Sequence, residues 1–205
     1  MPSPKDIYIH CDELEHLPPM CRKNWEEEIA LLAKTLKQRA TVLQVGCMDG
    51  TRILALFQAR PDLQISGLDI DQPLLEKARE NFQKANVTVA LHHRDITDGN
   101  LQKALGTFDD MLCLNNTLGY ISDISGALKN MKRLGKRVIV SVYGEKFTDE
   151  LAREYFSSIG LHLEGVKNNM FSLKDFVPVK RFTREEVQKW AQEIRETPLG
   201  YFCIL

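Results

Sequence analysis

Residues 41–59 read TVLQVGCMDGTRILALFQA, and this stretch indicates the class of fold. A short apolar run, 41–45, is followed by a turn that contains Gly46 and Gly50, and then by a helical pattern that ends near Pro61. A strand, a tight turn and a helix in direct succession are typical of the start of a βαβ unit. The stretch therefore predicts a parallel sheet, with ligands beyond the carboxyl ends of its strands.

The same alternation continues along the rest of the chain. Further strands are predicted at 64–70, 87–93, 108–114, 137–142, 161–173 and 201–205. Helical patterns separate most of them, the first with Asn24 as its N-cap and the last running from a Thr183 capping box through Ile194. We therefore expect an α/β fold with a doubly wound, seven-stranded and mostly parallel sheet. The 205 residues are expected to form one domain, with residues 1–40 as an N-terminal helical extension and residues 168–184 as a lid over the active site.

Charge and composition exclude several classes of function. Lys+Arg 27 against Asp+Glu 28 gives a net charge of -1, without the basic excess typical of proteins that bind nucleic acid or anionic membranes. No apolar run approaches the roughly 20 residues that span a bilayer. The five cysteines are scattered without a CxxC pair, which is typical of a reduced compartment. We expect a cytoplasmic protein with neither a nucleic-acid nor a membrane partner.

The first three strand ends carry residues that suit a nucleoside. The glycines of the first turn allow close approach of a ligand to the backbone, although a tight turn alone would explain them. Asp69 follows about twenty residues later, where an acid suits the hydroxyls of an adenosine ribose. Asp71 can serve as the N-cap of the next helix, which leaves Asp69 for a ligand. Asp95 can accept a hydrogen bond from an exocyclic amine, and Ile96 can pack on a base. Either residue could instead belong to a loop that binds no ligand.

The fourth strand ends in two amides, Asn115 and Asn116. Amides are costly to bury without partners, so these two either cap a turn or line a pocket. A nicotinamide dehydrogenase would have further glycines where Met48 and Thr51 stand, so a pyrophosphate could not come as close to this backbone. A cofactor without a pyrophosphate fits the sequence better.

Taken together, these runs resemble the class I S-adenosylmethionine-dependent methyltransferases. The resemblance is carried by VLQVGCMDG at 42–50, GLDID at 67–71, the pair at 95–96 and the segment 108–121. It covers residues 41–142 well and the last helix and strand in outline. The resemblance implies S-adenosyl-L-methionine as the cofactor and methyl transfer as the reaction.

The cofactor-binding residues that the resemblance implies are Gly46, Cys47, Gly50, Asp69, Ile70, Asp95, Ile96 and Asn115. The three residues of the turn would pass beneath the methionine moiety, and Asn115 would lie beside it near the transferable methyl group. Asp69 would bind the ribose hydroxyls, and Ile70 would pack on the adenine. Asp95 would accept a hydrogen bond from the adenine amino group, and the backbone of Ile96 would contact the ring.

Two positions depart from the family's usual pattern. Gln44 stands where an acid is usual, which weakens a hydrogen-bonding support of the glycine turn, and Met48 replaces a third glycine, which narrows the space over the cofactor. These changes leave open a second hypothesis, a catalytically silent member that binds the cofactor and regulates a partner. A third hypothesis is another adenosyl-ligand transferase, such as an aminopropyl transferase, although its polycationic substrate would favour acids where this chain has amides.

Methyl transfer by direct displacement can rest on alignment without a covalent nucleophile, so no catalytic residue is assigned. Asn116, Tyr120 and Tyr143 are the residues that we expect to face the acceptor. The amide pair does not form the (Asp/Asn)-Pro-Pro-Tyr signature of enzymes that methylate base or amide nitrogens. With the neutral overall charge, this absence favours a small-molecule methyl acceptor.

No metal site is predicted. His92 and His93 are neighbours on a predicted strand and point to opposite faces, so they cannot easily bind one ion. The other candidates have irregular spacing and no second pair to complete a tetrahedron: His10, Cys11, His16 and Cys21.

Overall fold

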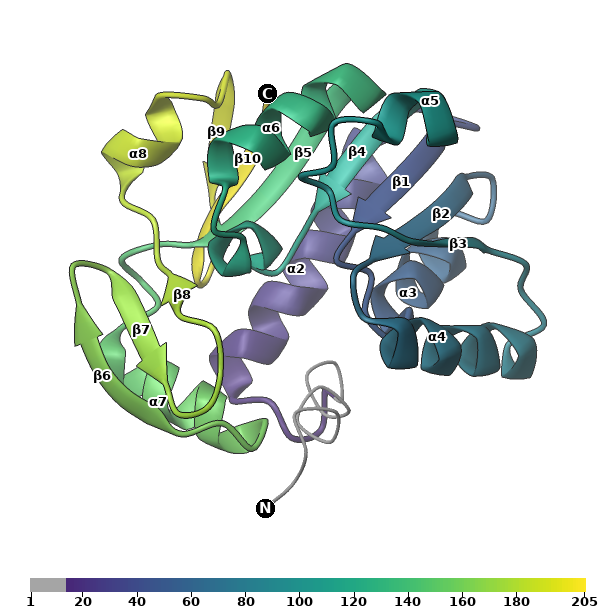
Figure 1. Ribbon diagram of the computed structural model, residues 1–205. Helices are drawn as coiled ribbons and strands as arrows, with labels where there is room; N and C mark the ends of the chain where they lie inside the picture. Colours follow the sequence, from purple (N-terminus) through teal and green to yellow (C-terminus); the bar gives the residue numbers. More distant parts are fainter. Residues whose placement is uncertain (1–13) are drawn as a thin grey trace.

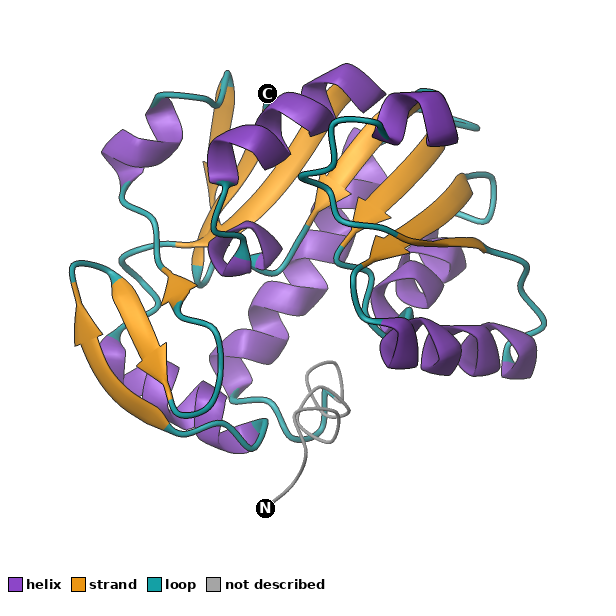
Figure 2. Cartoon of the chain, in the orientation of Figure 1, coloured by secondary structure: helices purple, strands orange, loops and turns teal. Residues whose placement is uncertain are grey.

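The computed structural model describes residues 14–205, and its centre is one open sheet (Figures 1 and 2). Within these residues the sheet has seven strands in the order β3-β2-β1-β4-β5-β10-β9. They are β1 (Thr41–Val45), β2 (Gln64–Asp69), β3 (Ala90–His93), β4 (Phe108–Cys113), β5 (Gly135–Tyr143), β9 (Glu193–Glu196) and β10 (Gly200–Ile204). The pairings among β1 to β5 are parallel, and β10 is antiparallel to both of its neighbours. The predicted seven-stranded, mostly parallel α/β fold is confirmed.

Helices cover both faces of the sheet. They are α2 (Pro19–Thr35), α3 (Thr51–Ala59), α4 (Gln72–Lys84), α5 (Leu101–Leu105), α6 (Ile124–Leu134), α7 (Asp149–Ser158) and α8 (Arg184–Gln188), with a 3₁₀ turn η2 (Thr117–Tyr120). α2, α3 and α4 share one buried apolar cluster with one face, while α5, α6 and α8 share another with the opposite face. Figure 1 shows α6 in front of the sheet and α2 behind it. Across residues 14–205, no helix combines the length and apolar character needed to cross a bilayer.

The central strand β1 is buried on both faces because it lies between β2 and β4. Val42 packs on the side of α2, α3 and α4, whereas Leu43 and Val45 pack on the side of α5 and α6. Strands covered on both faces are nearly continuous apolar runs, and Gln44 is the one polar exception to the run from Val42 to Val45. The chain continues from β1 outward to β2 and β3 and then returns to place β4 on the other side of β1, which makes the β1/β4 junction a topological switch point.

The expectation that residues 161–173 add a strand to the main sheet is wrong. They belong to a separate three-stranded sheet that consists of β6 (Leu163–Lys167), β7 (Met170–Leu173) and β8 (Val179–Lys180). Asn168 and Asn169 both have positive φ, the conformation that a tight hairpin turn requires. Phe171 packs with Phe156 of α7 in a third apolar cluster, so the hairpin buries its apolar face away from the main sheet. Figure 2 shows this smaller sheet beside α7.

The last helix is shorter than predicted, and Ile194 lies on β9 instead. The Thr183 capping box is present, but the helix ends at Gln188. Apolar residues at 187, 190 and 194 fit a helical period, yet Ile194 pairs with Cys203 across the hairpin of β9 and β10. This pairing satisfies the backbone groups that β10 would otherwise expose at the edge of the sheet, and it outweighs the local helical pattern.

The first helix begins earlier than predicted, and Asn24 is not its N-cap. α2 starts at Pro19, since proline at the first helical position lacks only an N–H that would have no partner there. Asn24 lies inside the helix and is buried. Its Nδ2 donates to Glu28 Oε1 at 2.9 Å, and its Oδ1 accepts from the backbone N–H of Leu199 at 3.1 Å. Asn24 therefore connects α2 to the turn between β9 and β10.

Replacing Asn24 by alanine should lower the free energy of unfolding by about 1–3 kcal/mol, because the buried N–H of Leu199 loses its acceptor. Urea unfolding followed by circular dichroism measures this change. The neighbouring exposed substitution Lys23→Ala is the control and should change stability by no more than about 0.5 kcal/mol. Equal effects of the two substitutions would show that the connection to Leu199 does not stabilise the fold.

Candidate functional site

The carboxyl ends of the parallel strands meet at one edge of the sheet. Val45 is paired with Leu68 of β2 and with Cys113 of β4, and Asp69 is paired with His93 of β3. The loops that follow these strands therefore surround one cavity of about 330 Å³ at the switch point between β1 and β4. This volume is within the usual range for small-molecule sites, roughly 300–1,000 Å³.

Most of the predicted cofactor-binding residues line this cavity: Gly46, Asp69, Ile70, Asp95, Ile96 and Asn115. Cys47 and Gly50 are not part of its lining. Cys47 is buried in the apolar cluster beneath α3 and α4, where burial raises the pKa of its thiol. Gly50 has φ 79°, and a side chain there would collide with the ring of Phe82. These two residues therefore shape the turn, while Gly46 reaches the cavity wall.

Gly46 is required by the geometry of the turn itself. Its φ is 66°, in the left-handed region that favours glycine, and its N–H donates to Leu68 O at 2.8 Å. An added Cβ would also lie only 2.8 Å from Thr117 Oγ1. The geometry thus supports the interpretation that Gly46 is needed for a tight turn. Because Gly46 also lies on the cavity wall, it agrees as well with the interpretation that the turn lets a ligand approach the backbone.

Asp69 connects the glycine turn to the end of β2. Its Oδ2 accepts from the backbone N–H of Met48 at 2.8 Å, and its Oδ1 accepts from that of Asp71 at 3.0 Å. Burial raises the pKa of Asp69, and the backbone donors partly oppose that rise. Each carboxylate oxygen has two acceptor positions, so Asp69 can hold the turn and still accept from ligand hydroxyls. Asp71 caps α4 by accepting from Leu74 N at 3.1 Å, as predicted.

One end of the cavity presents the groups that a purine base needs. Ile70 lies on the cavity wall with 67% of its surface exposed, an unusual exposure for a large apolar side chain. Asp95 Oδ1 accepts from Thr97 N at 2.8 Å, and its carboxylate lies in an exposed loop. Ile96 is buried, and its carbonyl accepts from Asn130 Nδ2 at 2.8 Å, which fixes the backbone at this point.

The amides at the end of β4 have structural partners. Asn115 lines the cavity, and its Oδ1 accepts from the Tyr143 hydroxyl at 3.0 Å. Asn116 is buried and bonded to Lys180 O and Tyr143 N, at 2.9 and 3.0 Å. Burial raises the pKa of Tyr143 well above its usual value. Asn116 and Tyr143 therefore do not face the acceptor as expected, whereas Tyr120 does line the cavity.

Arg52 and Tyr155 are among the cavity-lining residues that were not predicted. Arg52 is on α3, directly after the glycine turn, and its buried guanidinium is paired with Glu28 of α2 at 2.8 Å. A charged residue within an otherwise apolar helical stretch, together with the acidic run at 26–28, was a signal that could have revealed it. Tyr155 comes from α7, and nothing in its local sequence indicates the cavity.

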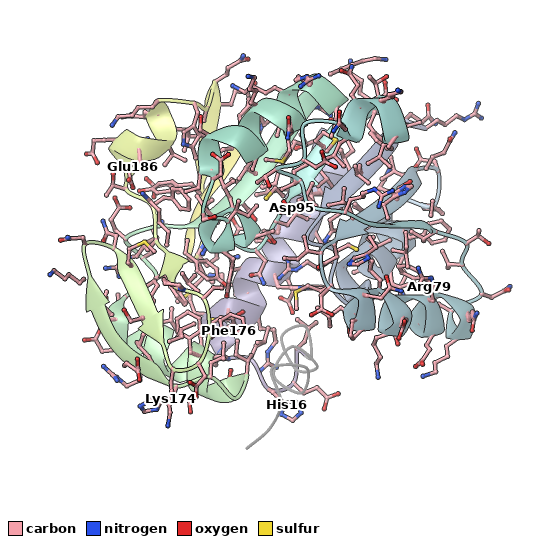
Figure 3. All side chains as sticks on the ribbon, in the orientation of Figure 1. His16, Arg79, Asp95, Lys174, Phe176 and Glu186 are labelled. Atoms are coloured by element: carbon pink, nitrogen blue, oxygen red, sulfur yellow. The ribbon has the colours of Figure 1, made fainter. Side chains whose placement is uncertain are left out.

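The segment 168–184 lies next to the rim of the cavity. Phe176 contacts Tyr120 edge-on, with ring centroids 6.3 Å apart, and Lys180 O accepts the hydrogen bond from Asn116. Figure 3 labels Phe176 on the loop between β7 and β8 and Asp95 at the carboxyl edge of the main sheet. That this segment closes over the site as a lid stays a prediction.

The candidate metal ligands lie partly outside the described residues. Within residues 14–205, no three His, Cys, Asp or Glu side chains come together in a way that could hold a metal ion. His10 and Cys11 lie outside the described residues, so the N-terminal candidates are not tested as a group.

Comparison with known protein families agrees with this geometry. Residues 42–137 match the model of a family described as a methyltransferase domain, and they include β1 to β4 with the turns that surround the cavity. Within residues 42–137, the chain belongs to the class I S-adenosylmethionine-dependent methyltransferases. S-adenosylmethionine is the cofactor typical of this family.

Curated relatives match about half of the chain. A carboxy-S-adenosyl-L-methionine synthase of Campylobacter hominis is 26% identical over 113 residues, which are 55% of this chain and 46% of that protein. A ribosomal protein L11 methyltransferase of Thermotoga petrophila is 36% identical over 94 residues, which are 45% of this chain and 33% of that protein. The chain therefore spans less than half the length of these relatives.

Solved structures share the fold over most of the chain. An S-adenosylmethionine-dependent methyltransferase from Clostridium acetobutylicum aligns with a TM-score of 0.65 and 13% identity. A protein from Pyrococcus horikoshii aligns with a TM-score of 0.71 and 17% identity. Each alignment covers 89% of this chain and 89% of the other. The methyltransferase fold thus extends well beyond the residues that match the family model.

The two departures from the methyltransferase pattern are visible in the site. Met48 has φ 49°, a left-handed conformation that a glycine would adopt without strain. Met48 is part of the cavity lining, and its side chain packs against the third apolar cluster, as those of Tyr120 and Phe176 do. Gln44 is buried, and its Oε1 has no hydrogen-bond partner among the described residues. Neither departure fills the cavity.

The substitution Gly46→Ala should lower the free energy of unfolding by about 1–3 kcal/mol, because it adds strain at a positive φ and a collision with Thr117. Chemical denaturation measures the change. Gly99→Ala is the matched control, since a Cβ at Gly99 meets no atom within 4 Å, and it should be neutral within about 0.5 kcal/mol. Equal stability of the two variants would contradict this account of the turn.

Proposed function

We propose that this chain transfers a methyl group from S-adenosylmethionine to a small-molecule acceptor. The observation that supports this most directly is that Gly46, Asp69, Ile70, Asp95 and Ile96, from three different strand ends, line one cavity. The proposal assigns these residues to the cofactor in the order that the family resemblance implies, from the methionine moiety at Gly46 to the adenine at Asp95 and Ile96.

The chemistry of these side chains fits an adenosyl ligand. Asp69 has acceptor capacity for ribose hydroxyls in addition to the two backbone bonds that hold it. Ile70 offers an exposed apolar surface to a base, and the Asp95 carboxylate can accept from an exocyclic amine. When bound, S-adenosylmethionine would supply an electrophilic methyl carbon on its sulfonium. The residues of the chain would hold and align the reactants, which is the main requirement of a direct displacement.

Two features favour a small acceptor that needs no strong base from the protein. Tyr120 on the cavity wall contacts Phe176 of the segment proposed as a lid, and a cavity covered by that segment would favour a compact molecule over a folded protein surface. The described residues of the lining include no His, Lys or Cys. An oxyanion that has already lost its proton, or a neutral amine that releases a proton to solvent after methylation, would suit such a site.

The first test is binding of S-adenosylmethionine, S-adenosylhomocysteine and NAD to the protein, measured by thermal shift. A ligand at about 100 times its dissociation constant stabilises the folded protein by about 2.7 kcal/mol, which raises the melting temperature of a domain of this size by roughly 5–10 °C. We expect shifts with the two adenosyl ligands and none with NAD. Absence of a shift with both adenosyl ligands would refute the proposed function.

The substitution Asp95→Ala should weaken binding of S-adenosylhomocysteine roughly tenfold, because the adenine loses a charged acceptor. Isothermal titration calorimetry measures the dissociation constant. Asp98→Ala is a close control: Asp98 Oδ1 accepts from Asn100 N at 2.9 Å as Asp95 Oδ1 accepts from Thr97 N, yet Asp98 is not in the cavity lining. If both variants weaken binding equally, the loop and not the Asp95 carboxylate supports the ligand.

The class of acceptor can be tested with S-adenosylmethionine that carries a labelled methyl group. The protein and labelled cofactor are incubated with a cell extract, which is then separated by ultrafiltration into small molecules and macromolecules. New labelled products among the small molecules would support the proposal. Label confined to protein would instead favour a protein substrate, and binding without any transfer would favour the catalytically silent alternative.

A further inference from the structure

The cavity wall holds a buried ion pair that its other residues do not explain. The side chains of Arg52 and Glu28 are 5% and 2% exposed, and Arg52 Nη1 donates to Glu28 Oε2 at 2.8 Å. The guanidinium of Arg52 also lies over the ring of Trp25, 5.5 Å from its centroid. Only Arg52 of these three residues is part of the cavity lining.

Glu28 is held in place from behind. Asn24 Nδ2 donates to Glu28 Oε1 at 2.9 Å, and Asn24 in turn accepts from the backbone N–H of Leu199. The two oxygens of Glu28 are therefore bonded to Asn24 and Arg52. This arrangement fixes the position and orientation of the Arg52 guanidinium at the cavity.

Stability alone gives little reason for such a pair. The desolvation of two buried charges can exceed the energy of their attraction, and an apolar pair of similar volume is often at least as stable. Charge placement gives a better reason. Among the described residues that line the cavity, Arg52 is the one cation, while the acidic residues are Asp69, Asp71, Asp95 and Asp123. A ligand with an anionic group would therefore place that group at Arg52.

We propose that Arg52 binds a carboxylate at this end of the cavity, and that the carboxylate belongs to the amino-acid moiety of the adenosyl cofactor. This inference rests on the proposed function. Arg52 is six residues beyond Gly46, at the start of the helix that follows the turn assigned to the methionine moiety. The planar guanidinium offers several N–H donors in a fixed array that matches a carboxylate. Without a carboxylate, a cation here would repel the positively charged groups of the cofactor. Glu28 and Asn24 are positioning residues for Arg52.

The test compares two ligands that differ in the amino-acid moiety. S-adenosylhomocysteine carries the moiety, and 5′-methylthioadenosine has the same adenosine and thioether without it. The double variant Glu28→Gln/Arg52→Met removes both charges and leaves no lone buried charge. The matched control, Glu80→Gln/Arg79→Met, makes the same chemical changes at exposed positions of α4. Calorimetry gives the dissociation constant of each ligand for each protein.

We expect the Glu28/Arg52 double variant to bind S-adenosylhomocysteine about 10- to 100-fold more weakly than the wild type and 5′-methylthioadenosine within about threefold of it. The exposed control should bind both ligands normally. Equal weakening of both ligands would show that the pair only supports the fold and would overturn the inference. Unchanged binding of both ligands would overturn it as well.

A second variant covers the case in which the double variant does not fold. Arg52→Lys keeps the charge and the ion pair with Glu28 but lacks the planar array of donors. This substitution should weaken the binding of S-adenosylhomocysteine several-fold more than the binding of 5′-methylthioadenosine. The melting temperature of the variant should stay close to that of the wild type. Failure of this inference differs from failure of the proposed function. If the wild-type protein binds neither ligand, the proposed function is refuted. If the wild type binds both ligands and Arg52→Lys changes their two dissociation constants by the same factor, only the role of Arg52 is refuted.

Discussion

The carboxylate of Asp69 joins the two loops on which the whole site depends. One oxygen accepts from Met48 in the glycine turn after β1, and the other accepts from Asp71 at the start of α4. The two loops belong to neighbouring parallel strands, and the register of Val45 with Leu68 brings them within reach. A buried carboxylate with a raised pKa is a costly group, and its two backbone donors make it tolerable. The same residue therefore fixes the turn and presents acceptor capacity to a ligand.

A second polar network connects the periphery of the fold to the same cavity. It runs from the backbone N–H of Leu199, between β9 and β10, through Asn24 and Glu28 of α2 to Arg52 of α3. The first and last hydrogen bonds join elements that are distant in sequence, the middle one lies within α2, and the members are almost fully buried. Helix α2 is therefore more than an extension before the sheet, because it determines where the cation on the cavity wall points.

The parts of the structure that the sequence predicts are those that depend on neighbours in the chain. The glycine turn, the cap at Asp71 and the acids at strand ends have local signatures, and the sheet follows from their alternation. The parts that it does not predict depend on partners far along the chain. Asn24 accepts from the backbone N–H of Leu199, 175 positions away, whereas its local sequence predicts only a helix cap. Ile194 fits a helical period locally, and only its pairing with Cys203 places it on a strand.

Contacts with other parts of the chain also determine what the two departures from the family pattern do to the turn. An acid at position 44 would support the glycine turn from beneath, and Gln44 instead has a buried oxygen without a partner among the described residues. The turn is nevertheless held from the side, because Met48 N–H is bonded to Asp69 and Gly46 N–H to Leu68 O. Met48 has a left-handed backbone, and its side chain packs against the third apolar cluster. The apolar contacts that the Met48 side chain makes with this cluster therefore offset part of the strain in its backbone.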